Sequence, residues 1–488
     1  MNWEKTTDRK ERFALTLLVL LILVHIVLWI RRVAGVFTFP YPLDYHEGVV
    51  LFWARQAANH APLYPEIYPG SFWIHNPYTP LFAWLGASLR VLDRFHIFLA
   101  GRVVAFISFI VCFVLVTAIS RRKAGKAAGY ICGILFLFSP LAGRYGTLVM
   151  PDMTALAFSL GAFWVIEHAD KKWSIHFSAL LASCAVGAKQ VFFASPITCA
   201  LLAFSRNRRT FLIWMALFFV FTATAIFISG ATGRNHLFQH LVVFNILPFS
   251  IRHFLSIFSL VAGRHALLFV AMAMFLADSR RQKEPLWIYA VFSLVVVLLS
   301  AKPGAEENYY LEFIALASIA GGIILAETAA KNRRVVYMVC IAQLFLFLPF
   351  KPAAVFTRTY GQEIPATSAY TGTGTAEREI GQIIVAEILS ATGDVLCEDI
   401  GFLEAAGAGV LVEPYQFAQL AEAGRLDDSF LVESIREHRF SLVVLSADSM
   451  EKKSQFFTAR TLSAIKENYI PRRIVGNWYI CEPKTYSQ

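Results

Sequence analysis

Charge is scarce in this sequence. Only 16% of the 488 residues are Asp, Glu, Lys or Arg, and 57% are apolar, whereas soluble domains carry about 25% charged residues. The apolar residues form blocks long enough to cross the hydrocarbon core of a bilayer as helices. This composition excludes soluble globular, disordered, collagenous and disulfide-scaffold proteins. It predicts a polytopic α-helical membrane protein.

Metal-binding and disulfide motifs are also missing. The seven cysteines have no metal-ligand spacing, and no pair of histidines has the HExxH pattern of a zinc site on a helix. Five cysteines lie in apolar runs, where a thiol behaves as a small apolar side chain. The other two, Cys397 and Cys481, could form a disulfide if the C-terminal tail faces an oxidising compartment.

Apolar runs and the basic residues between them predict about eleven transmembrane helices. The first run follows basic residues as a signal peptide does, but Arg31 and Arg32 replace the small residues of a cleavage site, so we interpret it as a retained helix. Five later basic clusters fall on the side of the N-terminus, which the positive-inside rule makes cytoplasmic. Segment 79–92 is too short to cross comfortably, so we place it on the outer surface as an amphipathic helix. The predicted spans are 13–30, 98–120, 127–142, 153–168, 175–188, 190–204, 210–229, 265–278, 286–301, 310–327 and 334–350.

The tail differs from the rest of the chain in charge. Residues 351–488 hold 13 Lys+Arg and 18 Asp+Glu, and the first 350 residues hold 31 and 16. Because the excess of basic residues lies in the membrane part, it marks cytoplasmic loops, and we expect no nucleic acid partner. We therefore divide the chain into a transmembrane domain, 1–350, with outer loops 31–97, 230–264 and 301–309, and an outer tail domain, 351–488, joined through 366–376.

The tail alternates strand-like and helical patterns, which predicts a small extracytoplasmic α/β domain with βαβ units. The predicted strands are 393–399, 409–414, 440–448 and 474–483, and the predicted helices are 377–391, 415–424, 428–438 and 456–468.

Acidic residues are few in the predicted outer loops, and two of them share the segment PLDYHEG. Asp44 followed three residues later by Glu47 has the spacing of a helix capping box, which needs no catalysis to explain it. A carboxylate held at a membrane surface could also take the proton of a bound hydroxyl. The two interpretations are compatible, because a capping residue is fixed in position.

Two more charged residues have both a structural and a functional interpretation. Asp152 follows Arg144 and Pro151 at the start of a predicted helix, where the helix dipole favours an acid, yet an acid at membrane depth is also a site hypothesis. Lys189 stands between two apolar runs, so it either extends to the interface or binds an anion there.

Two outer loops carry further candidates. Loop 230–264 mixes basic residues, Arg234 and His236 among them, with apolar ones and contains no acid. Such a loop suits a lipid phosphate above an acyl chain, or an interfacial helix on anionic lipid. The segment KPGAEENYY, with Lys302, Asn308 and Tyr309, is a polar loop between two helices, a common place for ligand contacts.

The order of these motifs resembles the GT-C membrane glycosyltransferases, close to the protein O-mannosyltransferase-like and aminoarabinose-transferase-like groups. The motifs are DYHEG, ANHAPLY, NPYTPLFAWL, GRVVAF, SPLAGRYGTLVMPD, the lysine of AKQ, and KPGAEENYYLEF. The resemblance covers most of residues 1–350 and implies a sugar donor on a polyprenyl phosphate and a site facing away from the cytoplasm. The family's first-loop acid falls on Asp44 or Glu47; many members have an adjacent Asp-Glu pair there, whereas this chain has His46-Glu47.

Carried over by position, the resemblance places a second acid at Asp152 and a phosphate-binding lysine at Lys189. We expect Tyr78 and Pro80 to position the first outer loop. Donor phosphate or acceptor contacts are expected from Asp152, Lys189, Arg144, Arg234, His236, Lys302, Asn308 and Tyr309.

The implied reaction is transfer of a hexosyl or pentosyl group to a hydroxyl of a glycan, lipid or protein acceptor, with inversion and with a carboxylate as base. A divalent cation, Mg²⁺ or Mn²⁺, could bind Asp44, Glu47 and Asp152. The expected location is a bacterial plasma (inner) membrane, with its lipids around the spans. A transporter or flippase for a lipid-linked or anionic solute is the main alternative, although the sequence has no internal repeat and only His25 as a clear mid-span charge. A non-catalytic sensor or scaffold is a third possibility.

Overall fold

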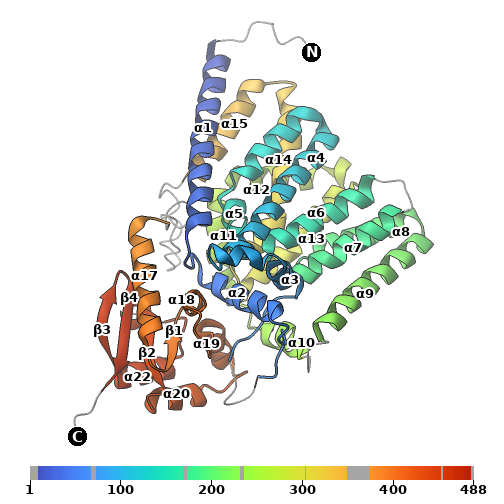
Figure 1. Cartoon of the computed structure of the whole chain (residues 1–488). Helices are drawn as coiled ribbons and strands as arrows, with labels where there is room; N and C mark the ends of the chain where they lie inside the picture. The colour runs from blue at the N-terminus through green and yellow to red at the C-terminus, as the bar shows by residue number, and fades with distance from the viewer. Residues whose placement is uncertain are drawn as a thin grey trace.

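The structure is a computed structural model that describes residues 9–67, 73–168, 173–230, 236–302, 304–348, 373–451 and 454–484. A body of long helices occupies most of the molecule, and a smaller α/β domain, the tail domain, packs at one end of it (Figure 1). The first helix begins at the opposite end of this body. The predicted boundary at 350/351 and most of the joint 366–376 lie outside the described residues.

The helical body contains long apolar helices and several short ones. Its first half comprises α1 (Arg9–Thr38), α2 (Tyr45–Ala58), α3 (Leu81–Ser88), η1 (Arg90–Arg94), α4 (Leu99–Leu137), α5 (Pro140–Tyr145), α6 (Asp152–His168), α7 (Trp173–Ala188), α8 (Ala194–Arg206) and α9 (Arg208–Gly230). Its second half comprises α10 (Leu237–Leu241), η2 (Val243–Asn245), α11 (Ile251–Arg264), α12 (Ala266–Ala277), η3 (Ser279–Arg281), α13 (Pro285–Leu298), η4 (Leu299–Ala301), η5 (Glu307–Tyr310), α14 (Leu311–Ala329) and α15 (Arg333–Phe347).

A helix lies within each stretch that the sequence predicted to cross the membrane. Two predicted spans share α4, which breaks at Ala124 and Gly125, where Gly125 has φ 85°. By length and composition four of the described helical stretches could each cross a membrane: α1, α4, α9 and η5–α14. The pair α11–α12, bent by 97°, would be a fifth if it is one span. The mostly helical fold is therefore confirmed, whereas the multi-pass topology with eleven crossings remains a prediction.

The centre of the helical body is α14, whose apolar stretch is 89% buried. Its sequence is rich in Ala, Gly and Ser, and these small residues let a neighbouring helix approach closely. A methyl group on Gly322 would meet the Ala128 carbonyl of α4 at 2.6 Å. The close contact between α4 and α14 holds these two helices in a fixed relative position. It thereby also fixes the positions at which the loops before and after them begin and end.

Segment 79–92 forms α3 and the start of η1, elements of eight and five residues that are too short to cross a bilayer. They lie with α2 and α10 at the same end of the body as the tail domain (Figure 1). A short helix is therefore present there, whereas its place on the outer membrane surface remains a prediction.

The tail domain has a four-stranded sheet in the order β1-β2-β4-β3. Strands β1 and β2 are parallel, whereas β4 runs antiparallel to both β2 and β3. The strands are β1 (Asp394–Cys397), β2 (Phe440–Ser446), β3 (Tyr469–Val475) and β4 (Trp478–Pro483), and the helices are α17 (Thr375–Ser390), α18 (Ile400–Ala406), α19 (Pro414–Glu422), α20 (Ser429–Arg436), α21 (Ala447–Glu451) and α22 (Ala459–Asn468). The predicted α/β class is confirmed.

Two strand predictions in the tail were wrong. Segment 409–414 is not a strand of the sheet, because Val412 makes only an isolated bridge with Trp73 of the first loop. Segment 474–483 is not a continuous strand but the end of β3, a turn with Gly476 at φ 57°, and β4. The disulfide that the sequence allowed between Cys397 and Cys481 is not present, because both cysteines are free and buried.

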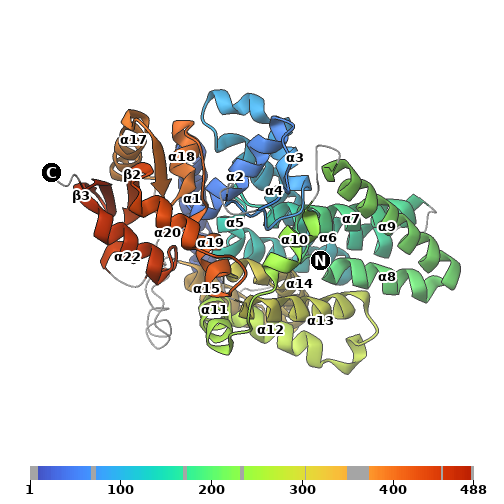
Figure 2. The same ribbon diagram turned by 90° about the horizontal axis from the view of Figure 1, so that it is seen from below.

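The first loop and the tail domain share one hydrophobic core. Val49 and Trp53 of α2 belong to the same buried cluster as Ile384 of α17 and Val395 of β1. Helix α18 packs directly on α2, as the view in Figure 2 also shows. Gly48 makes this approach possible, since a side chain there would overlap the backbone of Gly401.

We predict that Gly48→Ala weakens this packing and lowers the melting temperature of the detergent-solubilised protein by several degrees. An added methyl group in a filled contact costs about 1–3 kcal/mol, more than the helix propensity that alanine gains. The matched control is Gly263→Ala in α11, where no atom lies within 4 Å of the new methyl group. Equal melting temperatures for the two variants would contradict the close α2–α18 packing.

Candidate active site

Asp44 lies at the N-terminus of α2, at the junction between the helical body and the tail domain. Its Oδ1 accepts hydrogen bonds from the backbone N–H of His46 (3.0 Å) and from His46 Nδ1 (2.9 Å). Its Oδ2 accepts one from Arg144, at 2.5 Å. The capping role inferred from the sequence is thus present, and the same contacts fix the direction of the carboxylate.

Arg144 joins this group to the loop before α14. It lies on α5, a single turn begun by Ser139, and donates to Glu307 at 2.6 Å as well as to Asp44. Glu306 lies 3.8 Å from Arg144 and 3.9 Å from His46 Nδ1. Three loops that are distant in sequence therefore meet at one guanidinium group.

Glu47 has a different environment from Asp44. Its side chain is fully buried and accepts hydrogen bonds from the backbone N–H groups of Leu43 and Val149 and from Arg102 Nε and NH2, all at 2.8–3.0 Å. Arg102 is also fully buried, and its remaining N–H groups donate to the backbone carbonyls of residues that precede α2 in the chain. Glu47 therefore anchors the first loop on α4 and has no free oxygen for a substrate.

Asp152 and Lys189 form a second buried ion pair. Lys189 Nζ donates to Asp152 Oδ1 at 2.6 Å, and Asp152 Oδ2 has no hydrogen-bond partner among the described residues. The ammonium group also lies 5.2 and 5.7 Å from the ring centroids of Tyr78 and Tyr309. Lys189 is thus paired within the protein, whereas its place relative to the membrane surface remains a prediction.

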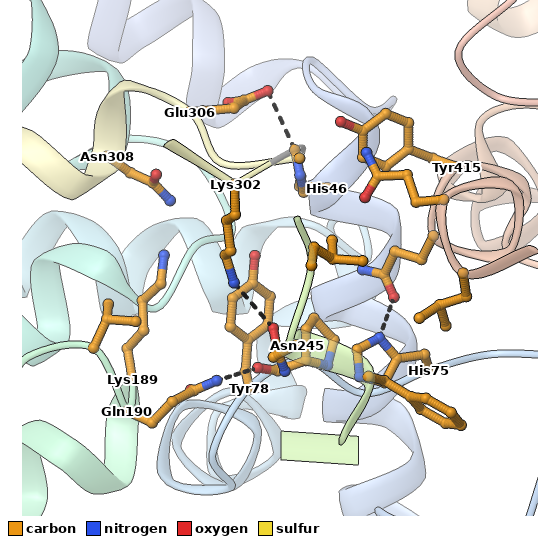
Figure 3. Close-up of a pocket in the computed structure, with 18 of the residues that line it drawn as sticks. His46, His75, Tyr78, Lys189, Gln190, Asn245, Lys302, Glu306, Asn308 and Tyr415 are labelled. Atoms are coloured by element: carbon orange, nitrogen blue, oxygen red, sulfur yellow. Dashed lines mark hydrogen bonds and ion pairs between the residues drawn. The ribbon is translucent and has the colours of Figure 1, made fainter. Parts of the chain in front are cut away.

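A cavity of about 80 Å³, here called the lysine cavity, lies beside these groups (Figure 3). Its polar lining comes from both the helical body and the tail domain. Lys302 enters it, donating to Asn245 Oδ1 at 3.3 Å. The lining residues are Tyr45, His46, His75, Pro77, Tyr78, Lys189, Gln190, Val191, Phe244, Asn245, Leu247, Lys302, Gly304, Glu306, Asn308, Tyr309, Tyr415, Gln416, Gln419 and Leu420.

A second cavity, here called the tail cavity, has a volume of about 590 Å³ and lies between the helical body and the sheet of the tail domain. Asp44 and Arg144 line it, whereas His46 and Glu306 line the lysine cavity. Tyr45 lines both. Tyr45 and the hydrogen-bonded pair Asp44–His46 therefore lie at the boundary between two cavities of different lining.

Burial and neighbouring charges both shift the pKa values of these groups. Burial raises the pKa of Asp44, but the His46 hydrogen bond and Arg144 outweigh it and hold the pKa well below its usual range. Burial lowers the pKa of His46, but Glu306 and Asp44 outweigh it and raise the pKa. Burial is the main cause that raises the pKa of Glu306, and the Asp44 charge adds to it. Burial, with repulsion from Lys189, lowers the pKa of Lys302 to about 8.

The remaining sequence-predicted residues are distributed as follows. Asn308 lines the lysine cavity together with Tyr78 and Tyr309. Pro80 is buried and begins α3. His236 is half-buried, donates its backbone N–H to the Tyr64 carbonyl and is absent from the lining of both cavities. Arg234 lies outside the described residues.

Sequence reasoning did not select His46, Glu306 or Tyr45 for the site. His46 stands in the DYHEG segment and Glu306 in KPGAEENYY, four residues after Lys302, so proximity to chosen residues was the available signal. Tyr415 comes from the tail, and no local pattern marks it. His75 also contacts the tail, with its Nδ1 3.1 Å from Gln416 Oε1.

One group of described residues could hold a metal ion: Asp44, His46 and Glu306, whose possible ligand atoms lie within 4.8 Å of one another. Glu47 and Asp152, which the sequence analysis grouped with Asp44, instead pair with Arg102 and Lys189. A carboxylate-imidazole set suits a divalent cation. His46 would bind it through Nδ1, the atom now directed at Asp44.

The comparisons with known proteins agree with this architecture. A model of the dolichyl-phosphate-mannose-protein mannosyltransferase family matches residues 75–230. A comparison with curated protein sequences gives no match. The crystal structure of ArnT from Cupriavidus metallidurans in the apo state is similar over 95% of this chain and 97% of its own, with TM-score 0.62 and 13% identity.

Two further solved structures are similar. ArnT from the same organism bound to undecaprenyl phosphate has TM-score 0.60 and 14% identity, over 95% of this chain and 97% of its own. The Archaeoglobus fulgidus oligosaccharyltransferase tethered to an acceptor peptide has TM-score 0.52 and 12% identity, over 97% of this chain and 74% of its own. This chain has the GT-C fold. Both cavities are lined by loop residues of the helical body and by residues of the tail domain, so they lie where these two parts meet.

We predict that Glu47→Gln destabilises the protein, because it leaves the Arg102 charge buried without its carboxylate. Breaking a buried ion pair in this way costs about 3–5 kcal/mol. Thermal unfolding in detergent should show a clearly lower melting temperature. The matched control is Glu482→Gln, which removes a half-exposed partner of Arg472 and should change little. An unchanged melting temperature in Glu47→Gln would rule out the anchoring role.

Proposed function

We propose that this chain is an integral-membrane glycosyltransferase that moves a sugar from a polyprenyl phosphate to an acceptor hydroxyl. The observation that carries the proposal is the position of Asp44, a carboxylate that lines the larger cavity beside the tail domain and is hydrogen-bonded to His46, a lining residue of the lysine cavity. The GT-C fold and the family match over residues 75–230 support the same reaction class.

The lysine cavity is the better place for the donor phosphate. Lys189 and Lys302 both line it, with amide groups from Gln190 and Asn308 nearby. Among the described residues no carboxylate lies within ion-pair distance of Lys302, so its charge is free for an anion. ArnT, similar in fold, is known bound to undecaprenyl phosphate. Fixed positive charge in a site of low dielectric stabilises a departing phosphate.

The acceptor hydroxyl then approaches from the tail cavity, past Asp44. Its oxygen forms a bond to the anomeric carbon as the bond from that carbon to the phosphate oxygen breaks, which inverts the carbon in a single displacement. The hydroxyl proton passes to Asp44. A carboxylate with a low pKa is a weak base towards a free alcohol, so Asp44 first orients the hydroxyl and takes its proton late, when the forming C–O bond has made it strongly acidic.

Glu47 and Asp152 have supporting parts in this proposal. Glu47 holds the start of α2 through Arg102, and Asp152 orients Lys189. Arg144 neutralises the charge of Asp44 and holds the Oδ2 atom of that carboxylate in place. A sugar specificity, hexosyl or pentosyl, is not assigned by these contacts.

The transporter alternative has less support from the contacts of the described residues. His25, the mid-span candidate, is bonded within the chain: its Nε2–H donates to the Leu344 carbonyl at 2.9 Å, and its ring stacks on Phe138 at 5.1 Å. The charged residues of the site instead gather at the tail end of the body. This distribution suits chemistry at one membrane surface.

We further propose that the N-terminus faces the cytoplasm of a bacterial plasma membrane and that the tail domain and the site lie outside it. The start of α1 and the tail domain lie at opposite ends of the helical body, as this orientation requires (Figure 1). The division into a membrane domain, 1–350, and a tail domain, 351–488, remains part of the proposal.

The test uses the full chain in nanodiscs with a panel of polyprenyl-phosphate sugars and measures donor consumption, with and without EDTA or added Mg²⁺ or Mn²⁺. We expect one donor to be consumed and Asp44→Asn to lower kcat at least 100-fold with an unchanged melting temperature. Asp427→Asn, on an exposed tail residue, is the control and should keep full activity. Consumption of no donor, combined with transport of one into liposomes, would favour the flippase.

A pH dependence follows from Lys302. With a pKa of about 8, its ammonium group loses its proton as the pH rises from 7 to 9. Donor binding then has to take up a proton, so the donor KM should rise about tenfold for each pH unit above 8 if the phosphate needs this charge. Lys302→Arg stays charged over this range, and its KM should stay flat. A flat wild-type profile would remove Lys302 from the donor site.

A further inference from the structure

The tail cavity is bordered by the ends of parallel strands. Glu398 and Asp399 follow β1 directly, and Ser446 is the last residue of β2. Ligands of α/β sheets bind outside the carboxyl ends of parallel strands, where loops offer side chains that the sheet holds in place. The β4 strand, antiparallel to β2, brings Asn477 and Trp478 to the same edge.

The lining of the tail cavity is acidic. Besides Asp44 it includes Glu377, Glu398 and Asp399, and its one basic lining residue, Arg144, already donates to Asp44 and Glu307. This is the reverse of the lysine cavity. Among the described residues such a lining offers no free cation to phosphate or carboxylate groups, and its carboxyl oxygens favour hydroxyl or ammonium donors.

The two carboxylates at the end of β1 are held in fixed directions. Glu398 accepts from the Ser446 backbone N–H at 2.9 Å and is 3% exposed. Asp399 accepts from the Gly401 backbone N–H at 2.8 Å as the N-cap of α18. Burial is the main cause that raises the pKa of Asp399 to about 7, so near neutral pH its carboxyl group can both donate and accept.

Aromatic rings form a further part of the wall. Trp478 meets Phe402 edge-on at 5.3 Å, and Tyr45 meets Phe456 in the same way at 5.3 Å. All four rings line the cavity. Aromatic faces beside fixed carboxylates complement a sugar ring, whose C–H face is apolar and whose edge carries hydroxyl groups.

We propose that the tail cavity binds the acceptor, and that this acceptor is a neutral or amine-bearing sugar unit rather than a phosphate- or carboxylate-bearing one. That the ligand is the acceptor rests on the proposed function, whereas the chemical class of the ligand is inferred from the residues that line the tail cavity. The sugar lies against Trp478 with its polar edge toward Glu398 and Asp399 and one hydroxyl group directed at Asp44.

The test measures direct binding without any donor. The full chain in nanodiscs is titrated calorimetrically with three trisaccharides: an N-acetylglucosamine trimer, which is neutral, a glucosamine trimer, which carries amines, and a galacturonate trimer, which carries carboxylates. We expect binding of the first two and at least tenfold weaker binding of the third. Equal or tighter binding of the galacturonate trimer, or binding of none of the three, overturns the proposal.

Three variants tie the binding to this cavity. Trp478→Ala should weaken binding at least tenfold, whereas Tyr479→Ala should not, because Tyr479 belongs to the core on the other face of β4. Asp399→Asn keeps a residue that caps α18 and should weaken the glucosamine trimer more than the neutral one. Melting temperatures confirm folding, and equal loss in Trp478→Ala and Tyr479→Ala overturns the assignment.

Donor consumption separates this proposal from the proposed function. If the sugars bind as expected but no polyprenyl-phosphate sugar is consumed, the transferase proposal fails and the sugar site stands. If a donor is consumed and its sugar passes to a phosphate-bearing acceptor while the neutral trimer does not bind, the acceptor assignment fails and the transferase stands.

Discussion

The bond between Arg144 and Asp44 is the interaction on which the site depends. At 2.5 Å it joins α5 of the helical body to the first residue before α2, and the same guanidinium group reaches Glu307 in the loop before α14. Two carboxylates this close would repel each other in a buried site without a shared cation. Arg144 therefore allows three loops to converge at the boundary between the lysine cavity and the tail cavity.

Two buried ion pairs around the site keep this arrangement rigid. Arg102 and Glu47 fix the start of α2 against α4, and Lys189 and Asp152 fix the α7–α8 connection against the start of α6. Each pair lies where one helix of the body ends or begins, so the apolar helices determine where the charges are. Ion pairs that are buried away from water adopt only a narrow range of distances and angles. The side chains that line the cavities are therefore positioned before a ligand binds.

Much of this could be predicted from the sequence, and the limits have physical causes. Apolar runs marked the helices because length and hydrophobicity are local properties, and Asp44 could be predicted as a cap from its own segment. The partner of Lys189 could not be predicted, because Asp152 is 37 residues away and the pair forms only when α6 and α7 pack. Val412 looked like a strand residue, yet its one bridge is to Trp73 in the first loop, a contact that only the folded chain creates.

The tail domain forms half of the candidate site. It closes one wall of both cavities, with Tyr415 and Gln416 on the lysine cavity and Asp399 and Trp478 on the tail cavity. It also shares a core with α2, the helix that Asp44 begins. A shift of the tail domain would thus move Asp44 and the walls of both cavities together, so the two cavities cannot be adjusted independently. In the proposed reaction, the different charge of the two cavities gives the site a direction, because only the lysine cavity stabilises an anionic leaving group.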